Sequence, residues 1–160
     1  MPEVICNTSV LQYLHQLGLL HLLRELYGTV VVPEPVASEI AAGQEHGVNL
    51  PALATLPWVR LESVTIPTAA TGDLGAGELA VLTLAGARPG SVVVLDDGLA
   101  RRYARLAGIR FTGTCGVLLR AKERGLVPAI APLLGQLGSL GFRLDPATRT
   151  SLLKLAGEAE

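Results

Sequence analysis

The chain has 160 residues, of which 49% are hydrophobic and 17% charged, and its formal net charge is −1. This length fits one domain of roughly 100–200 residues, so we expect a single domain over residues 1–160. A disordered chain would combine few apolar residues with a large net charge, and this composition excludes one.

A mean hydropathy of +0.44 requires a search for membrane spans. The apolar stretch 126–142 contains two prolines and three glycines, unlike the about 20 continuous apolar residues of a spanning helix. The first ten residues carry no basic segment, which a signal peptide requires. We therefore expect a cytoplasmic protein without a membrane segment.

Charge is unevenly distributed along the chain. Residues 101–160 hold ten of the thirteen Lys and Arg residues and only four of the fourteen Asp and Glu residues. The pattern fits an acidic site beside a basic face that attracts polyanions. It also fits an ordinary solvated helical surface, and charge alone does not separate the two interpretations.

Cysteine and histidine spacing indicates no metal or disulfide framework. Cys6 and Cys115 are too few and too far apart for either, so we expect buried free thiols. The three histidines are scattered and do not have the spacing of a zinc site.

The first half of the chain alternates between strand and helix patterns. Residues 3–6 form a short buried strand, and Asn7-Thr8-Ser9 can cap a helix. Leucines then recur at helical spacing to residue 26 with an interruption at Gly18, which predicts two short helices. A strand at 29–32, a helix at 33–43, a strand at 58–64 and a loop at 65–73 follow.

The second half continues the alternation. We expect a helix at 75–87, a strand at 91–97, a helix at 97–108, a strand at 109–114 and a helix at 115–125. The tail holds an apolar segment at 128–141, a short segment at 142–144 and a last helix at 146–158. This order predicts an α/β fold with three layers, α/β/α, around a mainly parallel five-stranded sheet. Function is then expected outside the carboxyl ends of the strands.

Polar residues gather at those predicted strand ends. Asn7 ends the first strand, Asp96 and Asp97 end the fourth, and Glu39 and Glu78 lie early in apolar helices. Each has an ordinary explanation: Glu78 can favour a helix N-terminus, Glu39 can be exposed, and the two aspartates can cap the next helix. Four carboxylates in one crevice would instead repel one another and call for a divalent cation.

Five segments together resemble the PIN-domain superfamily: VICNTSVLQYL, VVVPEPVASEI, GAGELAVLTLA, VVVLDDGLARRYARLAGIRFTGT and GFRLDPATRTSLLKLAGE. The closest likeness is to a prokaryotic subfamily of PIN-like proteins, and it covers nearly the whole chain. The resemblance implies a small Mg²⁺- or Mn²⁺-dependent ribonuclease, often the toxin of a toxin–antitoxin pair.

The resemblance also implies a set of site residues. Its acidic positions fall on Asn7, Glu39, Glu78 and Asp97, with Asp96 beside the last, and these would hold the metal. The carboxylates Glu39, Glu78, Asp96 and Asp97 would then support catalysis. Its hydroxyl-bearing stretch falls on Thr112 and Thr114, as candidates for RNA contact.

Asn7 departs from the family pattern, which has aspartate there. An amide oxygen can ligate Mg²⁺ but brings no negative charge, so metal affinity should be weaker. If active, the metal would lower the pKa of a bound water and neutralise the phosphodiester. Arg101, Arg102 and Arg105 follow the acidic pair, and Arg101 and Arg105 share one helix face, so we expect them to contact RNA phosphates.

Two alternatives compete with the nuclease. Because Asn7 replaces an acidic ligand, the chain could be a catalytically weakened PIN-like module that binds RNA or protein, so the sequence leaves open whether it is an enzyme. Gly75-x-Gly77-x-x-Ala80 imitates a dinucleotide-binding motif, although no strand directly precedes it. The expected partners are RNA, an antitoxin protein if the chain is a toxin, and a second copy of the chain in a homodimer.

Overall fold

A computed structural model describes residues 2–67 and 72–158, and its centre is one parallel sheet of five strands. The strands are β1 Val4–Cys6, β2 Val30–Pro33, β3 Val59–Glu62, β4 Val92–Val94 and β5 Arg110–Thr112, in the order β3-β2-β1-β4-β5. All four neighbouring pairs are parallel. The predicted α/β class and five-stranded sheet are therefore confirmed.

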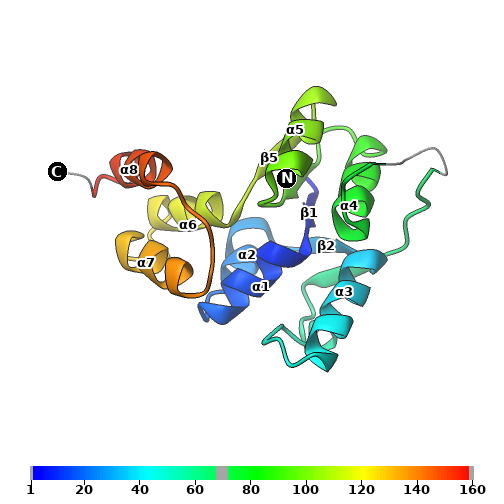
Figure 1. The fold of residues 1–160 in the computed structure, drawn as a ribbon, viewed down its shortest axis with the longest axis horizontal. Coiled ribbons are helices and arrows are strands. Elements are labelled where there is room, and N and C mark those ends of the chain that lie inside the picture. Colours follow the sequence, from blue (N-terminus) through cyan, green and yellow to red (C-terminus); the bar gives the residue numbers. More distant parts are fainter. Residues whose placement is uncertain (1, 68–71, 159–160) are drawn as a thin grey trace.

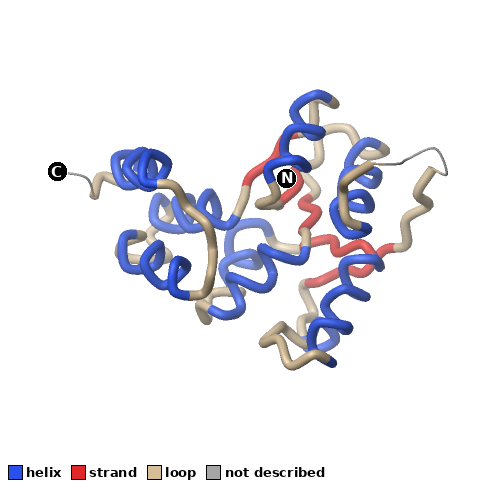
Figure 2. The backbone as a smooth tube through the Cα atoms, in the orientation of Figure 1, coloured by secondary structure: helices blue, strands red, loops and turns tan. Residues whose placement is uncertain are grey.

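Helices cover the sheet (Figure 1). They are α1 Thr8–Gln16, α2 His21–Tyr27, α3 Glu34–Glu45, α4 Ala76–Gly86, α5 Gly98–Leu106, α6 Thr114–Glu123, α7 Ala131–Ser139 and α8 Pro146–Leu155, with a short 3₁₀ turn at Leu53–Thr55. Helix α4 packs on β1, β2 and β4 between α3 and α5, whereas α2 contacts β2 and α6 contacts β5. Figure 2 shows the strands running between these two groups of helices.

The central strands are short and apolar because helices cover the sheet. All residues of β1 and β2 are buried, which is typical of parallel strands covered on both faces. The edge strand β3 is half exposed and carries Arg60 and Glu62. The sequence predicted β3 and β4 too long: β4 ends at Val94, and the two aspartates after it belong to the turn before α5.

Most predicted helices are confirmed within a few residues, including the two short helices on either side of Gly18. That glycine has a φ of +73°, a conformation that side-chain-bearing residues rarely adopt. The apolar segment 128–141 contains α7, while residues 142–144 form neither helix nor strand. The predicted loop 65–73 includes residues 68–71, which lie outside the described residues.

The C-terminal region is tied to the rest of the domain by Glu158. Its carboxylate accepts hydrogen bonds from the backbone N–H groups of Ile130 (2.8 Å) and Ala131 (2.9 Å), and it pairs with Lys122 Nζ at 2.9 Å. These bonds, the backbone donor of Ile130 first and then Lys122, lower the pKa of Glu158 to about 2. The end of α8 is thereby joined to α6 and to the start of α7.

Within residues 2–67 and 72–158, no helix is both long enough and apolar enough to cross a membrane. The two cysteines are free thiols, as predicted, with Cys6 buried and Cys115 half-buried. Burial raises the pKa of Cys115 to about 11 and that of Cys6 further, so neither thiol is an activated nucleophile.

Candidate active site

The carboxyl ends of β1 and β4 lie side by side, because Cys6 pairs with Val94. The chain leaves β1 toward β2 and β3 on one side and continues with β4 and β5 on the other. This reversal is the position where open α/β sheets bind ligands. A cleft of about 550 Å³ opens there, lined by Asn7, Thr8, Ser9, Gln12, Tyr13, Glu39, Glu78, Asp96, Asp97, Gly141, Phe142 and Arg143.

The structure thus brings all five residues of the predicted acidic cluster to one cleft. Asn7, Glu39 and Glu78 form a connected group around the first turn of α4. The Nδ2 group of Asn7 donates to Oε2 of Glu78 at 3.3 Å, and the Gly77 N–H donates to Oε1 of Glu39 at 2.6 Å. Thr8 Oγ1 donates to the other Glu39 oxygen at 2.9 Å.

Gly77 permits this close approach, because it has no side chain. A Cβ atom at position 77 would clash with Oε1 of Glu39 and lie 3.1 Å from Oδ1 of Asn7. A side chain at position 77 would therefore displace the side chains of Glu39 and Asn7. Sequence reasoning treated Gly77 as a tight helix start, because a glycine carries no sign of the side chain that packs over it.

The donor set of this group fits a divalent cation. Oδ1 of Asn7 is buried and accepts no hydrogen bond from the described residues, which is costly unless a ligand or water pairs with it. With Glu39 and Glu78 it offers the carboxylate and amide oxygens that hard cations prefer. Among the described residues, no three His, Cys, Asp or Glu side chains form a metal-ligand cluster, and Asn7 stands where the family pattern has a carboxylate.

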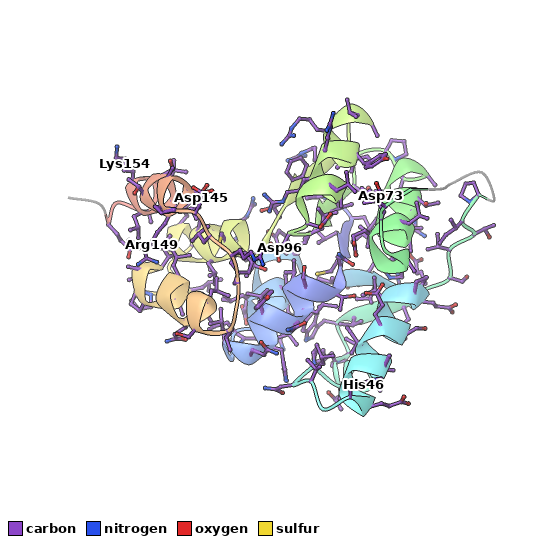
Figure 3. All side chains as sticks on the ribbon, viewed as in Figure 1. His46, Asp73, Asp96, Asp145, Arg149 and Lys154 are labelled. Carbon is purple, nitrogen blue, oxygen red and sulfur yellow. The ribbon has the colours of Figure 1, made fainter. Side chains whose placement is uncertain are left out.

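Asp96 and Asp97 have different surroundings. Oδ1 of Asp96 accepts the Thr114 N–H at 2.8 Å, and Oδ2 accepts the hydroxyls of Thr114 at 2.7 Å and Ser9 at 3.2 Å. Asp96 therefore links the β4 end to α1 and α6, near the middle of the molecule in Figure 3. Asp97 is exposed and caps α5 by accepting the Ala100 N–H at 2.9 Å. The capping interpretation thus holds for Asp97, while Asp96 bonds to the start of α6 instead.

Thr112 and Thr114, the two threonines expected to contact RNA, are not among the residues that line the cleft. Thr114 is fully buried and its hydroxyl donates a hydrogen bond to Asp96, so it positions that carboxylate. Thr112 lines a separate hollow with Phe111 of β5 and Arg120 of α6. Sequence alone does not distinguish a buried hydroxyl from one that faces the cleft.

The arginines of α5 lie beside the cleft and do not line it. Arg101 and Arg105 share a helix face as predicted, and both stack on Phe111, at 5.3 and 5.4 Å from the ring centroid. Arg101 also donates to the Leu95 carbonyl at 3.1 Å, and Arg102 is exposed. The cation that lines the cleft is Arg143, which sequence reasoning missed because it lies far along the chain from the acidic residues.

The dinucleotide-binding interpretation of Gly75 and Gly77 is wrong. Helix α4 begins after a loop, and the described residues between β3 and α4 contain no strand. The Gly77 N–H, which would face a pyrophosphate in that motif, is bonded to Glu39.

Comparison with known proteins shows similarity to a protein family and to a solved structure. A family model described as "DUF3368: PIN domain" matches residues 3–158. No curated protein matches this chain. A solved structure of a PilT N-terminus domain protein from the hyperthermophilic archaeon Sulfolobus solfataricus P2 is similar in fold, with a TM-score of 0.55 and 12% sequence identity. The match covers 74% of this chain and 92% of that one.

Proposed function

The chain belongs to the PIN-domain family, a superfamily of nuclease-type modules, and we propose that it is a divalent-metal-dependent endoribonuclease. The observation that carries the proposal is the convergence of Asn7, Glu39 and Glu78 on one turn of α4, with Oδ1 of Asn7 buried and unpaired. Asp96 and Asp97 line the same cleft.

In this proposal, Asn7, Glu39 and Glu78 would hold Mg²⁺ or Mn²⁺. A bound metal of this kind lowers the pKa of its water and offsets charge on a phosphodiester. The protein contributes a preorganised oxygen set: Thr8 and Gly77 orient the Glu39 carboxylate, while Ser9 and Thr114 orient Asp96. Fixed orientation matters because a misplaced catalytic group loses much of its effect.

The exposed Asp97 can contribute to the proposed reaction in addition to capping α5. It uses Oδ2 to cap α5, and among the described residues Oδ1 accepts no hydrogen bond. Asp97 can therefore orient a water or a metal-bound group at the open side of the cleft without giving up its cap. We propose a direct contribution from Asp97, and we propose that Asp96 acts mainly by fixing the cleft wall.

A second candidate function is a binding module that does not cleave. The Asn7 amide donates to Glu78, so the pair is hydrogen-bonded without a cation, which an aspartate at position 7 could not achieve. A site of this kind would bind RNA or a protein partner through the same cleft.

An assay for cleavage of a mixed pool of structured and unstructured RNA in Mn²⁺, Mg²⁺ or EDTA distinguishes the nuclease from the binding module. We expect cutting that depends on metal and falls at least a hundredfold in Glu78→Ala and Asp97→Ala, on the order of general acid–base or metal-site losses. Glu45→Ala, which removes an exposed glutamate of α3 outside the cleft, should retain activity. Cutting only by Asn7→Asp, or by no variant, would favour the binding module.

The cellular role follows from the same proposal. We propose that the chain acts on RNA in the cytoplasm as the toxin of a toxin–antitoxin pair and forms a homodimer, with an antitoxin segment covering the acidic cleft. Induced expression should then arrest growth, and Glu78→Ala should relieve the arrest. Growth arrest that persists in Glu78→Ala would contradict a toxic nuclease.

A further inference from the structure

Among the described residues that line the cleft, Arg143 carries the only positive charge. Its side chain is exposed, and no carboxylate of the described residues pairs with it within 4 Å. The same cleft is lined by four carboxylates. A nucleic-acid phosphate that enters it meets strong repulsion, and Arg143 is the group available to offset that repulsion.

The segment that carries Arg143 is fixed at both ends. On one side, the Phe142 ring packs edge-on against Tyr13 of α1, with ring centroids 5.1 Å apart and an interplanar angle of 87°. On the other side, Asp145 caps α8 by accepting hydrogen bonds from the N–H (2.9 Å) and hydroxyl (2.8 Å) of Thr148. Figure 1 shows this segment, between α7 and α8, passing α6 and α7 on the side that faces α1. The backbone that carries Arg143 is therefore fixed beside the cleft that this residue lines.

Arg101 of α5 is less available. Arg101 is bonded to the Leu95 carbonyl and stacked on Phe111, and its Nη2 lies 3.9 Å from Asp96. Arg143 also lines a neighbouring hollow of about 180 Å³ that contains Asp96 and Arg101. Arg143 thus lines both the acidic cleft and the hollow that Arg101 of α5 reaches.

We propose that Arg143 binds a phosphate of the substrate backbone at the cleft mouth, and that the contact between Phe142 and Tyr13 positions it there. The inference rests on the proposed function, because it assigns a substrate contact to the same cleft. A guanidinium group suits this task because its fork of N–H donors matches two phosphate oxygens.

Steady-state cleavage of a single-stranded RNA by four proteins tests the assignment. Relative to wild type, Arg143→Ala should raise KM about tenfold, as expected for loss of a charge-assisted hydrogen bond, and leave kcat within about threefold. Arg143→Lys should recover part of the loss, since lysine keeps the charge but not the fork. Arg124→Ala removes an exposed arginine outside the cleft and should leave both constants unchanged.

A binding measurement separates this inference from the nuclease proposal. Fluorescence anisotropy of the same labelled RNA in Mg²⁺ is measured at several salt concentrations with Glu78→Ala, with and without Arg143→Ala. Loss of one phosphate contact should lower the slope of log affinity against log salt by about 0.7. Wild-type cleavage with KM and slope unaffected by Arg143→Ala would overturn the inference and leave the nuclease intact. Binding that depends on Arg143 without any cleavage would support the inference and overturn the nuclease, and absence of RNA binding would overturn both.

Discussion

Replacing Asn7 by aspartate restores the carboxylate of the family pattern and should make the fold depend on metal. Asn7 is 3% exposed, and its amide donates to Oε2 of Glu78 at 3.3 Å. The substitution turns that hydrogen bond into a contact between two negative charges. At an effective dielectric constant of about 20, two unit charges at this separation repel by about 5 kcal/mol, and moving them to roughly 5 Å still leaves about 3 kcal/mol.

We therefore expect Asn7→Asp to lose about 3–5 kcal/mol of unfolding free energy in EDTA at pH 7. For a domain of this size the melting temperature should fall by roughly 6–20 °C, and added Mn²⁺ should recover most of the loss by binding the folded state. Thermal unfolding followed by circular dichroism, with and without Mn²⁺, measures both effects. Asn49→Asp is the matched control: Asn49 is exposed and its Oδ1 lies near a histidine ring nitrogen, so stability should change by about 0.5 kcal/mol or less. An Asn7→Asp protein as stable as wild type in EDTA would refute the electrostatic reasoning.

Two further predictions concern the cleft wall and the C-terminal region. Gly77→Ala should displace Glu39 and reduce cleavage at least tenfold. Gly86→Ala in the same helix, where a Cβ meets no atom within 4 Å, should keep activity and stabilise the helix by about 0.5–1 kcal/mol. Cleavage assays and urea unfolding test both variants, and a fully active Gly77→Ala protein would contradict the close approach of Glu39 to Gly77. Folding lowers the pKa of Glu158 from 4.5 to about 2, so its stabilising contribution is complete above pH 4.5 and is lost as pH falls from 4.5 toward 2. Acid unfolding of wild type should therefore be steeper in this range than acid unfolding of Glu158→Gln. Identical unfolding curves for the two proteins would contradict this prediction.

Much of the fold could be predicted because its signals are local. Short runs of valine and isoleucine indicate buried strands, and leucine spacing with glycine stops indicates the helices between them. Strand ends were less predictable. Leu95 continues the apolar run of β4 and still donates its N–H to the Thr112 carbonyl of β5 at 2.9 Å, whereas Asp97 already caps α5. Whether a residue extends a strand depends on its neighbours in space, which the sequence order does not give.

The candidate site could be predicted in part for the same reason. Asn7 follows β1 directly and Asp97 comes three residues after β4, so parallel strand order is enough to bring them near one another. Arg143 could not be found this way, because its place depends on how the segment between α7 and α8 packs against α1. The shared face of Arg101 and Arg105 was predicted from helical spacing, but the sequence does not say that this face stacks on Phe111.

Direct titration of Mn²⁺ into the protein, followed by electron paramagnetic resonance of the free ion, tests the central claim that this cleft holds a divalent cation. We expect a Mn²⁺ site in wild type whose affinity falls at least tenfold in Glu78→Gln and is unchanged in Glu45→Gln, because Glu78 belongs to the oxygen set around Asn7 and Glu45 lies outside the cleft. No Mn²⁺ binding by wild type, or binding that Glu78→Gln leaves unaltered, would contradict it.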